Sequence, residues 1–155
     1  MAGEAEARLA ELGITLPDAP APAANYVPYV RTGNQVFISG QVSWVGGERN
    51  FVGKVGTDFT VEEGQDAART VALNIIAQVK AACGGDLDRV VRCVKLGGFV
   101  NCPGDFHDHP KVINGASDLM VAVFGDAGRH ARFAVGAAAL PFNVAVEIDA
   151  VFEVQ

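Results

Sequence analysis

The stretch that decides the fold is Ala131–Val154, ARFAVGAAALPFNVAVEIDAVFEV. Side chains alternate in character over residues 131–140 and again over residues 144–154, with a break at Pro141–Asn143. Alternation with a period of two is typical of β-strands, and proline ends the pairing of a strand. We therefore predict two strands around a tight turn.

The first of these strands has two unequal faces. One face carries larger apolar side chains such as Phe133, and the other carries Arg132 among very small residues. The small residues are Ala134, Gly136 and Ala138. An open sheet normally has polar side chains on its wet face, so a strip of small residues predicts close packing by another element. We expect helices on the Phe133 face and another subunit over the Arg132 face, where Glu147 on the facing strand is a candidate partner for the guanidinium.

The length and composition of the chain favour a single domain that associates into an oligomer. It has 155 residues, of which 50% are hydrophobic and 19% are charged. This length suits one domain, 1–155, in which residues 1–20 form an N-terminal extension with a short amphipathic helix at Ala5–Leu12. So few charges on a small chain favour an oligomer.

Charge and cysteine content argue against several classes of protein. The net charge is −6 and the sequence has no cluster of Lys and Arg, which argues against a nucleic-acid partner. The three cysteines form no C-x-x-C pair, so neither a disulfide framework nor a zinc ribbon is expected. The acidic N-terminus and the lack of a long apolar run predict no signal peptide, no membrane span and a cytoplasmic location.

The rest of the chain predicts further strands and two long helices. Thr60 and Glu63 have the spacing of a capping box at the start of the first helix, and Gly84 ends it. The second helix begins at Asp108 or His109 and stops at Gly125. Further strands are predicted at 35–44 and 90–101. This order predicts an α+β fold in which two helices cover one face of a mixed sheet.

The C-terminal stretch resembles the RidA/YjgF family, also known as L-PSP or endoribonuclease-like proteins. The matching residues are Ala131-Arg132, Leu140-Pro141 and Val146-Glu147-Ile148, with no gap between Arg132 and Glu147. The resemblance extends from about Pro20 to the end of the chain and includes Pro28-Tyr29-Val30 and Ile38–Gln41. It implies a chorismate-mutase-like homotrimer of the bacillary type, with three sites at clefts between subunits.

The resemblance also implies roles for particular residues. Arg132 would hold the carboxylate of a small 2-imino acid, and Glu147 would place the hydrolytic water. The residues that would shape the site are Tyr29, Gly40, Asn114 and Ala134. The alternatives are structural: an ion pair between Arg132 and Glu147, core packing of Tyr29, a strand bulge at Gly40, and a tie at the start of the helix for Asn114.

Two positions depart from the family pattern. Phe133 and Ala134 stand where many relatives have Ser and Cys, so no cysteine nucleophile is available there. The expected function is hydrolysis of reactive 2-imino or enamine acids to 2-keto acids and ammonia, with no cofactor and no metal. The tract His107-Asp108-His109 lacks further ligands at usable spacing, and N-capping of the helix accounts for it better. The alternatives are a non-catalytic trimer that binds small carboxylate metabolites and, less favoured by the acidic composition, an endoribonuclease.

Overall fold

The computed structural model describes residues 3–22 and 24–155, so residues 1 and 2 of the predicted extension lie outside the described part. Its main sheet has five strands in the order β1-β2-β7-β5-β6. These strands are β1 (Tyr29–Thr32), β2 (Gln35–Val42), β5 (Val90–Asn101), β6 (Ala131–Ala137) and β7 (Val146–Val154). A two-stranded ribbon is formed by β3 (Trp44–Val45) and β4 (Glu48–Arg49). The helices are α1 (Glu4–Glu11), α2 (Val61–Ala82) and α3 (His109–Phe124), and short 3₁₀ turns occur at Leu87–Arg89, Gly125–Gly128 and Pro141–Asn143.

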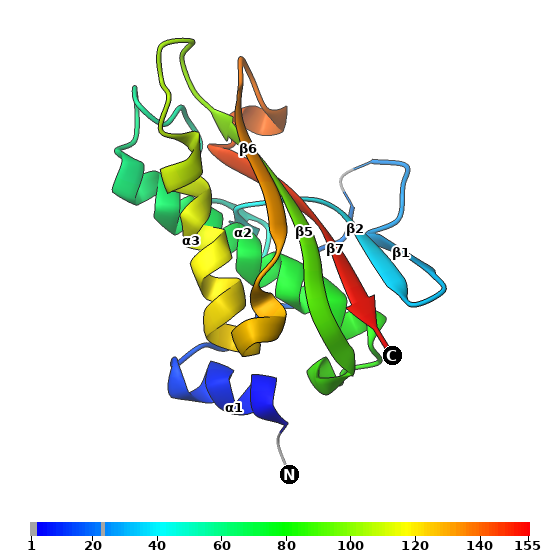
Figure 1. Ribbon diagram of the computed structural model, residues 1–155. Coiled ribbons are helices and arrows are strands. Elements are labelled where there is room, and N and C mark those ends of the chain that lie inside the picture. Colours follow the sequence, from blue (N-terminus) through cyan, green and yellow to red (C-terminus); the bar gives the residue numbers. More distant parts are fainter. Residues whose placement is uncertain (1–2, 23) are drawn as a thin grey trace.

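Helices α2 and α3 lie side by side over one face of the sheet, as predicted (Figure 1). Helix α1 is a third helix that packs against α3, and Arg8 Nη1 donates to the carbonyl of Val123 at 3.3 Å. Between the helices and the sheet lies the main hydrophobic core, which includes Ile75, Ile148 and Phe152. The α+β prediction is therefore confirmed.

Helix α2 begins and ends where the sequence predicts. Thr60 accepts a hydrogen bond from the backbone N–H of Glu63, and the Glu63 side chain accepts one from the backbone N–H of Thr60, which completes the capping box. The stripe Val71, Ile75 and Val79 is fully buried. After the helix, Gly84 adopts a positive φ of 67°, a conformation that side chains disfavour.

The prediction that β6 and β7 face each other was wrong, because β5 lies between them. Strand β5 pairs with β6 in parallel and with β7 antiparallel. The turn at Pro141–Asn143 therefore leads away from β6 to the far side of β5. Phe142 and Asn143 both take positive φ in this turn, at 58° and 57°.

The assignment of the two faces of β6 was also wrong. Arg132 and Ala134 lie on the helix side, whereas Phe133 and Val135 lie on the open side, where they are 36% and 42% exposed. Phe133 lies over the backbone of its neighbour Gly97, where a side chain would collide with its ring, and it contacts Phe99 edge-on at 5.3 Å.

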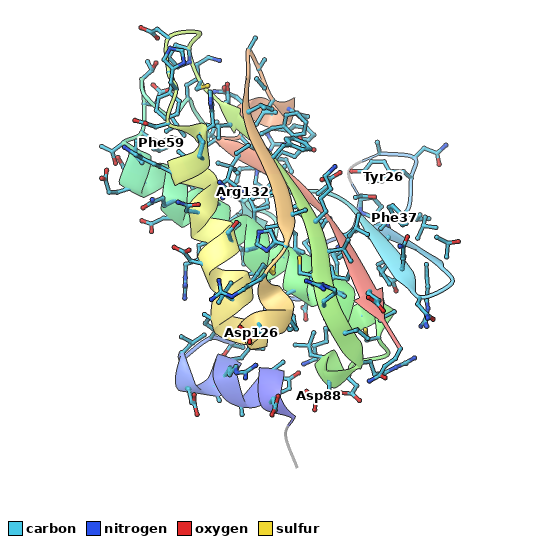
Figure 2. All side chains as sticks on the ribbon, in the orientation of Figure 1. Tyr26, Phe37, Phe59, Asp88, Asp126 and Arg132 are labelled. Carbon is cyan, nitrogen blue, oxygen red and sulfur yellow. The ribbon has the colours of Figure 1, made fainter. Side chains whose placement is uncertain are left out.

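The small residues of β6 instead allow parts of the same chain to approach closely. A Cβ at Gly136 would come within 2.6 Å of His109 Nε2 and 2.9 Å of Cys102 Sγ. Helix α3 and the loop before it therefore approach part of the strip for which we expected a second subunit, while Gly136 and Ala138 stay exposed. The uncovered apolar surface is on the opposite face of the sheet, where Val30 is also exposed. Phe37, which pairs with Val30, is exposed there too and is labelled in Figure 2.

All three cysteines are free and buried. Within residues 3–22 and 24–155, no helix combines the length and hydropathy needed to cross a membrane.

Candidate functional site

Arg132 is held by α3, and part of its guanidinium remains available. Its Nη1 donates to Asn114 Oδ1 at 2.8 Å and to Ser117 Oγ at 3.2 Å, and its Nη2 donates to the carbonyl of Pro110 at 3.4 Å. Among the described residues, Nε–H and the second Nη2–H have no hydrogen-bond partner. These two donors suit the side-on, two-pronged contact that guanidinium makes with a carboxylate. Figure 2 shows Arg132 at β6 beside α3.

A hydrogen-bonded chain behind Arg132 was not foreseen from the sequence. His130 Nδ1 lies 2.6 Å from the carbonyl of Gly128, and His130 Nε2 lies 2.8 Å from Ser117 Oγ. Since a carbonyl can only accept, Nδ1 carries the proton and Nε2 accepts from the hydroxyl of Ser117. The Ser117 oxygen is then free to accept from Arg132, so the neutral imidazole fixes the orientation of the hydroxyl.

Burial lowers the pKa of His130 from its ordinary value of 6.5, and the positive charge of Arg132 adds to this effect. The hydrogen bond to Gly128 acts in the opposite direction but does not outweigh burial. His130 is thus kept neutral, as its role as acceptor requires. In the sequence, only the spacing of His130 two residues before Arg132 indicates that both side chains lie on the α3 side of the strand.

Glu147 lies elsewhere, on β7, and Gly40 makes room for it. The register of β2 and β7 shifts between Ile38 and Gln41, which places Gly40 in a β-bulge. A Cβ at Gly40 would overlap the Glu147 carboxylate. The strand bulge expected as the structural alternative for Gly40 is therefore present, and its role in shaping a ligand site stays a prediction.

The environment of Glu147 changes its acidity. Burial raises the pKa of its carboxyl above the ordinary 4.5, and the neighbouring Asp149 raises it further. Such a carboxyl exchanges protons nearer to neutral pH than a solvated one does. Glu147 and Gly40 also line a cavity of about 410 Å³ between the segment before β1, the end of β2 and the turn at Pro141–Asn143.

Arg132 and Glu147 do not meet within one chain. Arg132 on β6 lies opposite Leu96 on β5, and Leu96 lies opposite Ala150 on β7. Ala150 is three residues beyond Glu147 on the same strand. Two strand spacings and three residues put the two backbones roughly 14 Å apart, on opposite faces of the sheet. Within the described residues neither side chain forms an ion pair. The alternative of a structural ion pair between them within one chain is therefore wrong.

Of the remaining predicted residues, Asn114 and Ala134 lie near Arg132, and Tyr29 lies at neither place. Asn114 lies at Arg132, as described, and Ala134 packs next to it on the same face of β6, against the core. Tyr29 pairs with Ile38 and is packed against the core from the end of β1. Tyr29 is not among the residues that line the cavity at Glu147, whereas Tyr26 is.

The described part of the chain contains no group of three or more His, Cys, Asp and Glu side chains placed to hold a metal ion. Near the tract 107–109, His109 packs edge-on against Phe106 at 5.5 Å. Asp108 is the N-cap residue of α3, but its side chain makes no capping hydrogen bond. The predicted capping role is thus confirmed for the backbone position only.

Comparison with known proteins gives a consistent family. Residues 6–153 match the family described as "YjgF/chorismate mutase-like, putative endoribonuclease". Protein TCP17 of Trypanosoma cruzi is 53% identical over 99% of this chain and 96% of its own length. The structure of Atu1372 from Agrobacterium tumefaciens, a protein of unknown function, is 50% identical with a TM-score of 0.91, over 97% of this chain and 92% of that one. A Shewanella oneidensis MR-1 protein that carries the same endoribonuclease description is 38% identical with a TM-score of 0.94, over 98% of this chain and all of that one.

A more distant relative was solved with a small molecule. TdcF of Escherichia coli with bound serine is 26% identical with a TM-score of 0.62, over 88% of this chain and 93% of that one. The family match spans nearly the whole chain, and the relatives named above cover it almost end to end. The chain therefore belongs to the YjgF/RidA family.

Proposed function

We propose that this protein hydrolyses small 2-imino acids to 2-keto acids and ammonia. The observation that carries the proposal is the guanidinium of Arg132, which is fixed by three acceptors and retains two adjacent donors for a carboxylate. Asn114 and Ser117 orient the group, so little conformational freedom is lost when the ligand binds.

The chemistry needs a water and a proton carrier as well as a carboxylate clamp. Water adds to the carbon of the C=NH group, and Glu147 takes one proton from this water and passes it to the imine nitrogen, which gives a carbinolamine. Glu147 then takes the hydroxyl proton of the carbinolamine and passes it to the amine nitrogen, so that the C–N bond breaks and the ketone and ammonia are released. A carboxyl whose pKa is raised by burial and by Asp149 suits both transfers.

The separation of Arg132 from Glu147 supports a site shared between subunits. A small 2-imino acid is only a few atoms long and cannot span roughly 14 Å. The proposal is therefore that Arg132, Asn114 and Ala134 of one subunit meet Gly40 and Glu147 of a neighbour in a trimer. The exposed apolar face of the sheet, with Phe37, Phe99 and Phe133, supports such an assembly.

The test is release of 2-keto acid from an imine generated in situ by an amino acid oxidase. The expected result is a rate above that of buffer, proportional to the concentration of this protein. A rate equal to that of buffer, in a preparation that binds 2-keto acids, would establish the alternative of a non-catalytic carboxylate-binding protein. The serine bound to TdcF favours a small amino-acid-like ligand in either case.

The endoribonuclease alternative rests on the family description. The net charge of −6 gives the chain little attraction for a polyanion. RNA cleavage that survives removal of contaminating nucleases, and that is lost in Arg132→Ala, would replace the proposal.

A further inference from the structure

The cavity beside Glu147 is larger than a small 2-imino acid requires. It has a volume of about 410 Å³, within the range of sites for drug-sized ligands, and its walls are mostly apolar. Glu147 and Gly40 occupy one side of it, and Trp44 and Phe142 contribute aromatic rings.

The aromatic wall is built from two distant parts of the chain. The rings of Trp44, on β3, and Phe142, in the turn before β7, have their centroids 4.7 Å apart at an angle of 46°. The guanidinium of Arg49 covers this pair, 4.9 Å from the Trp44 ring and 5.4 Å from the Phe142 ring. Phe142 holds its ring there from a backbone with φ of 58°, which a bulky residue disfavours.

Helix α2 fixes the other walls. Asn74 donates from Nδ2 to the carbonyls of Val42 and Trp44, at 2.8 and 2.9 Å. Gln78 donates to the carbonyl of Pro20 at 2.6 Å and so ties the segment before β1 to the helix. The cavity is thus bounded by elements that are anchored to the core.

Two residues that line the cavity have polar atoms without hydrogen-bond partners. Trp44 Nε1 and Asn74 Oδ1 are buried and have no hydrogen-bond partner among the described residues. A buried polar group without a partner destabilises a fold by about 1–3 kcal/mol. An arrangement that leaves two such groups beside one cavity is not optimised for the stability of the empty chain, which is common at binding sites.

We infer that this cavity binds the side chain of the substrate and that this side chain is aromatic. The inference rests on the proposed function for the position of the reacting group: the imine carbon lies at Glu147, and the carboxylate extends toward Arg132 of the neighbouring subunit. The side chain then points the other way, past Gly40, onto the rings of Trp44 and Phe142. Offset and edge-on contacts with these rings favour an aryl group, and Glu147 disfavours an acidic one.

The test compares two 2-keto acids that differ only in the side chain, phenylpyruvate and pyruvate, by calorimetry. We expect phenylpyruvate to bind at least tenfold more tightly. In Ala21→Phe, which places a ring into the cavity from its exposed rim, we expect this preference to fall below twofold because phenylpyruvate loses affinity. Val27→Phe is the matched control, because Val27 belongs to the same segment and is 56% exposed but does not line the cavity. Equal affinities for the two acids in the unaltered protein would overturn the inference.

A second measurement separates this inference from the proposed function. Trp44 is the only tryptophan of the chain, so its fluorescence reports directly on the cavity. Benzyl alcohol has an aryl group but no carboxylate, and it should change this fluorescence saturably in the unaltered protein and in Arg132→Ala, but not in Ala21→Phe. Propanol should have no such effect. If neither 2-keto acid binds but benzyl alcohol does, the proposed function fails and the aryl site stands; if benzyl alcohol gives no saturable change, the aryl site fails whatever the 2-keto acids do.

Discussion

Arg132 Nη1 donates to Asn114 Oδ1 across 2.8 Å, which joins the edge strand β6 to the second turn of α3. Strand and helix are therefore linked at the residue that the family resemblance assigns to carboxylate binding. Because Asn114, Ser117 and Pro110 occupy three directions around one guanidinium, its free edge has a defined orientation before any ligand arrives.

Arg132→Ala should lower the rate of imine hydrolysis by about 100-fold or more, since a misplaced imine gains little from Glu147. Loss of these partly exposed hydrogen bonds should cost about 1–2 kcal/mol of stability. Arg132→Lys should rescue poorly, because one ammonium cannot satisfy three acceptors and a carboxylate together. Hydrolysis rate and thermal midpoint are measured on the same samples. Full activity in Arg132→Ala would remove this residue from the mechanism.

The positions of the helices and strands could be predicted from the sequence better than the pairing of the strands in the sheet. Alternation and capping residues located β5, β7 and α2 because these signals are local. The position of β5 between β6 and β7 depends on pairing between distant segments, which alternation does not encode. The two faces of β6 were predicted the wrong way round for the same reason. Small residues indicate close packing, but they do not indicate whether α3 or another subunit packs there.

The candidate site was predictable only in part, for a related reason. Arg132, Asn114, Gly40 and Glu147 stand at matching positions of the family pattern, so they could be named from the sequence. Ser117 and His130 could not, since their roles depend on hydrogen bonds across the gap between α3 and β6. The Trp44–Phe142 wall was missed because the two residues are far apart in sequence and neither belongs to the motif.

Gly40→Ala should impair catalysis more than stability. The added methyl would occupy space held by the Glu147 carboxylate, which is the flexible end of a side chain and can move aside. We expect a loss of about 1 kcal/mol or less in stability and a fall in kcat of about 10- to 100-fold. Affinity for pyruvate, which depends on Arg132, should change little. A normal kcat would show that the position of Glu147 is not critical.

The pH dependence of hydrolysis should report on Glu147. Burial and Asp149 raise the pKa of this carboxyl, so it loses its proton at a higher pH than 4.5. If ionised Glu147 accepts the proton of water, the acidic limb of kcat/KM should lie above 4.5. Asp149→Asn removes the neighbouring negative charge, lowers the pKa of Glu147 and should move the limb to lower pH. A limb that does not move in this variant would show that another group is being titrated.

His130 should make the carboxylate clamp weaken in acid. Its pKa is lowered in the folded chain, so as the pH drops below 6.5 the unfolded chain takes up this proton before the folded chain does. The free energy of unfolding therefore decreases as the pH decreases. In the folded chain this protonation occurs at a lower pH, and it turns Nε2 into a donor, so that Ser117 loses the orientation in which it accepts from Arg132. The thermal midpoint should therefore begin to drop below 6.5 and pyruvate affinity should drop at a lower pH than that, and His130→Gln should remove this component of both. An NMR titration of His130 at or above 6.5 would contradict the assignment.

The exposed apolar face of the sheet should be the contact between subunits. Phe133 lies on the edge strand β6, over Gly97 and against Phe99, and is only partly covered within the chain. Phe133→Glu would bury a carboxylate if this face is an interface, which association cannot tolerate without a partner charge. Sedimentation should then change from a trimer to a monomer, and hydrolysis should be lost even though Arg132 and Glu147 are intact. Val27→Glu, at a more exposed apolar residue outside the main sheet, should change neither. A Phe133→Glu protein that remains a trimer, or a monomer that still hydrolyses imines at the full rate, would contradict a site shared between subunits.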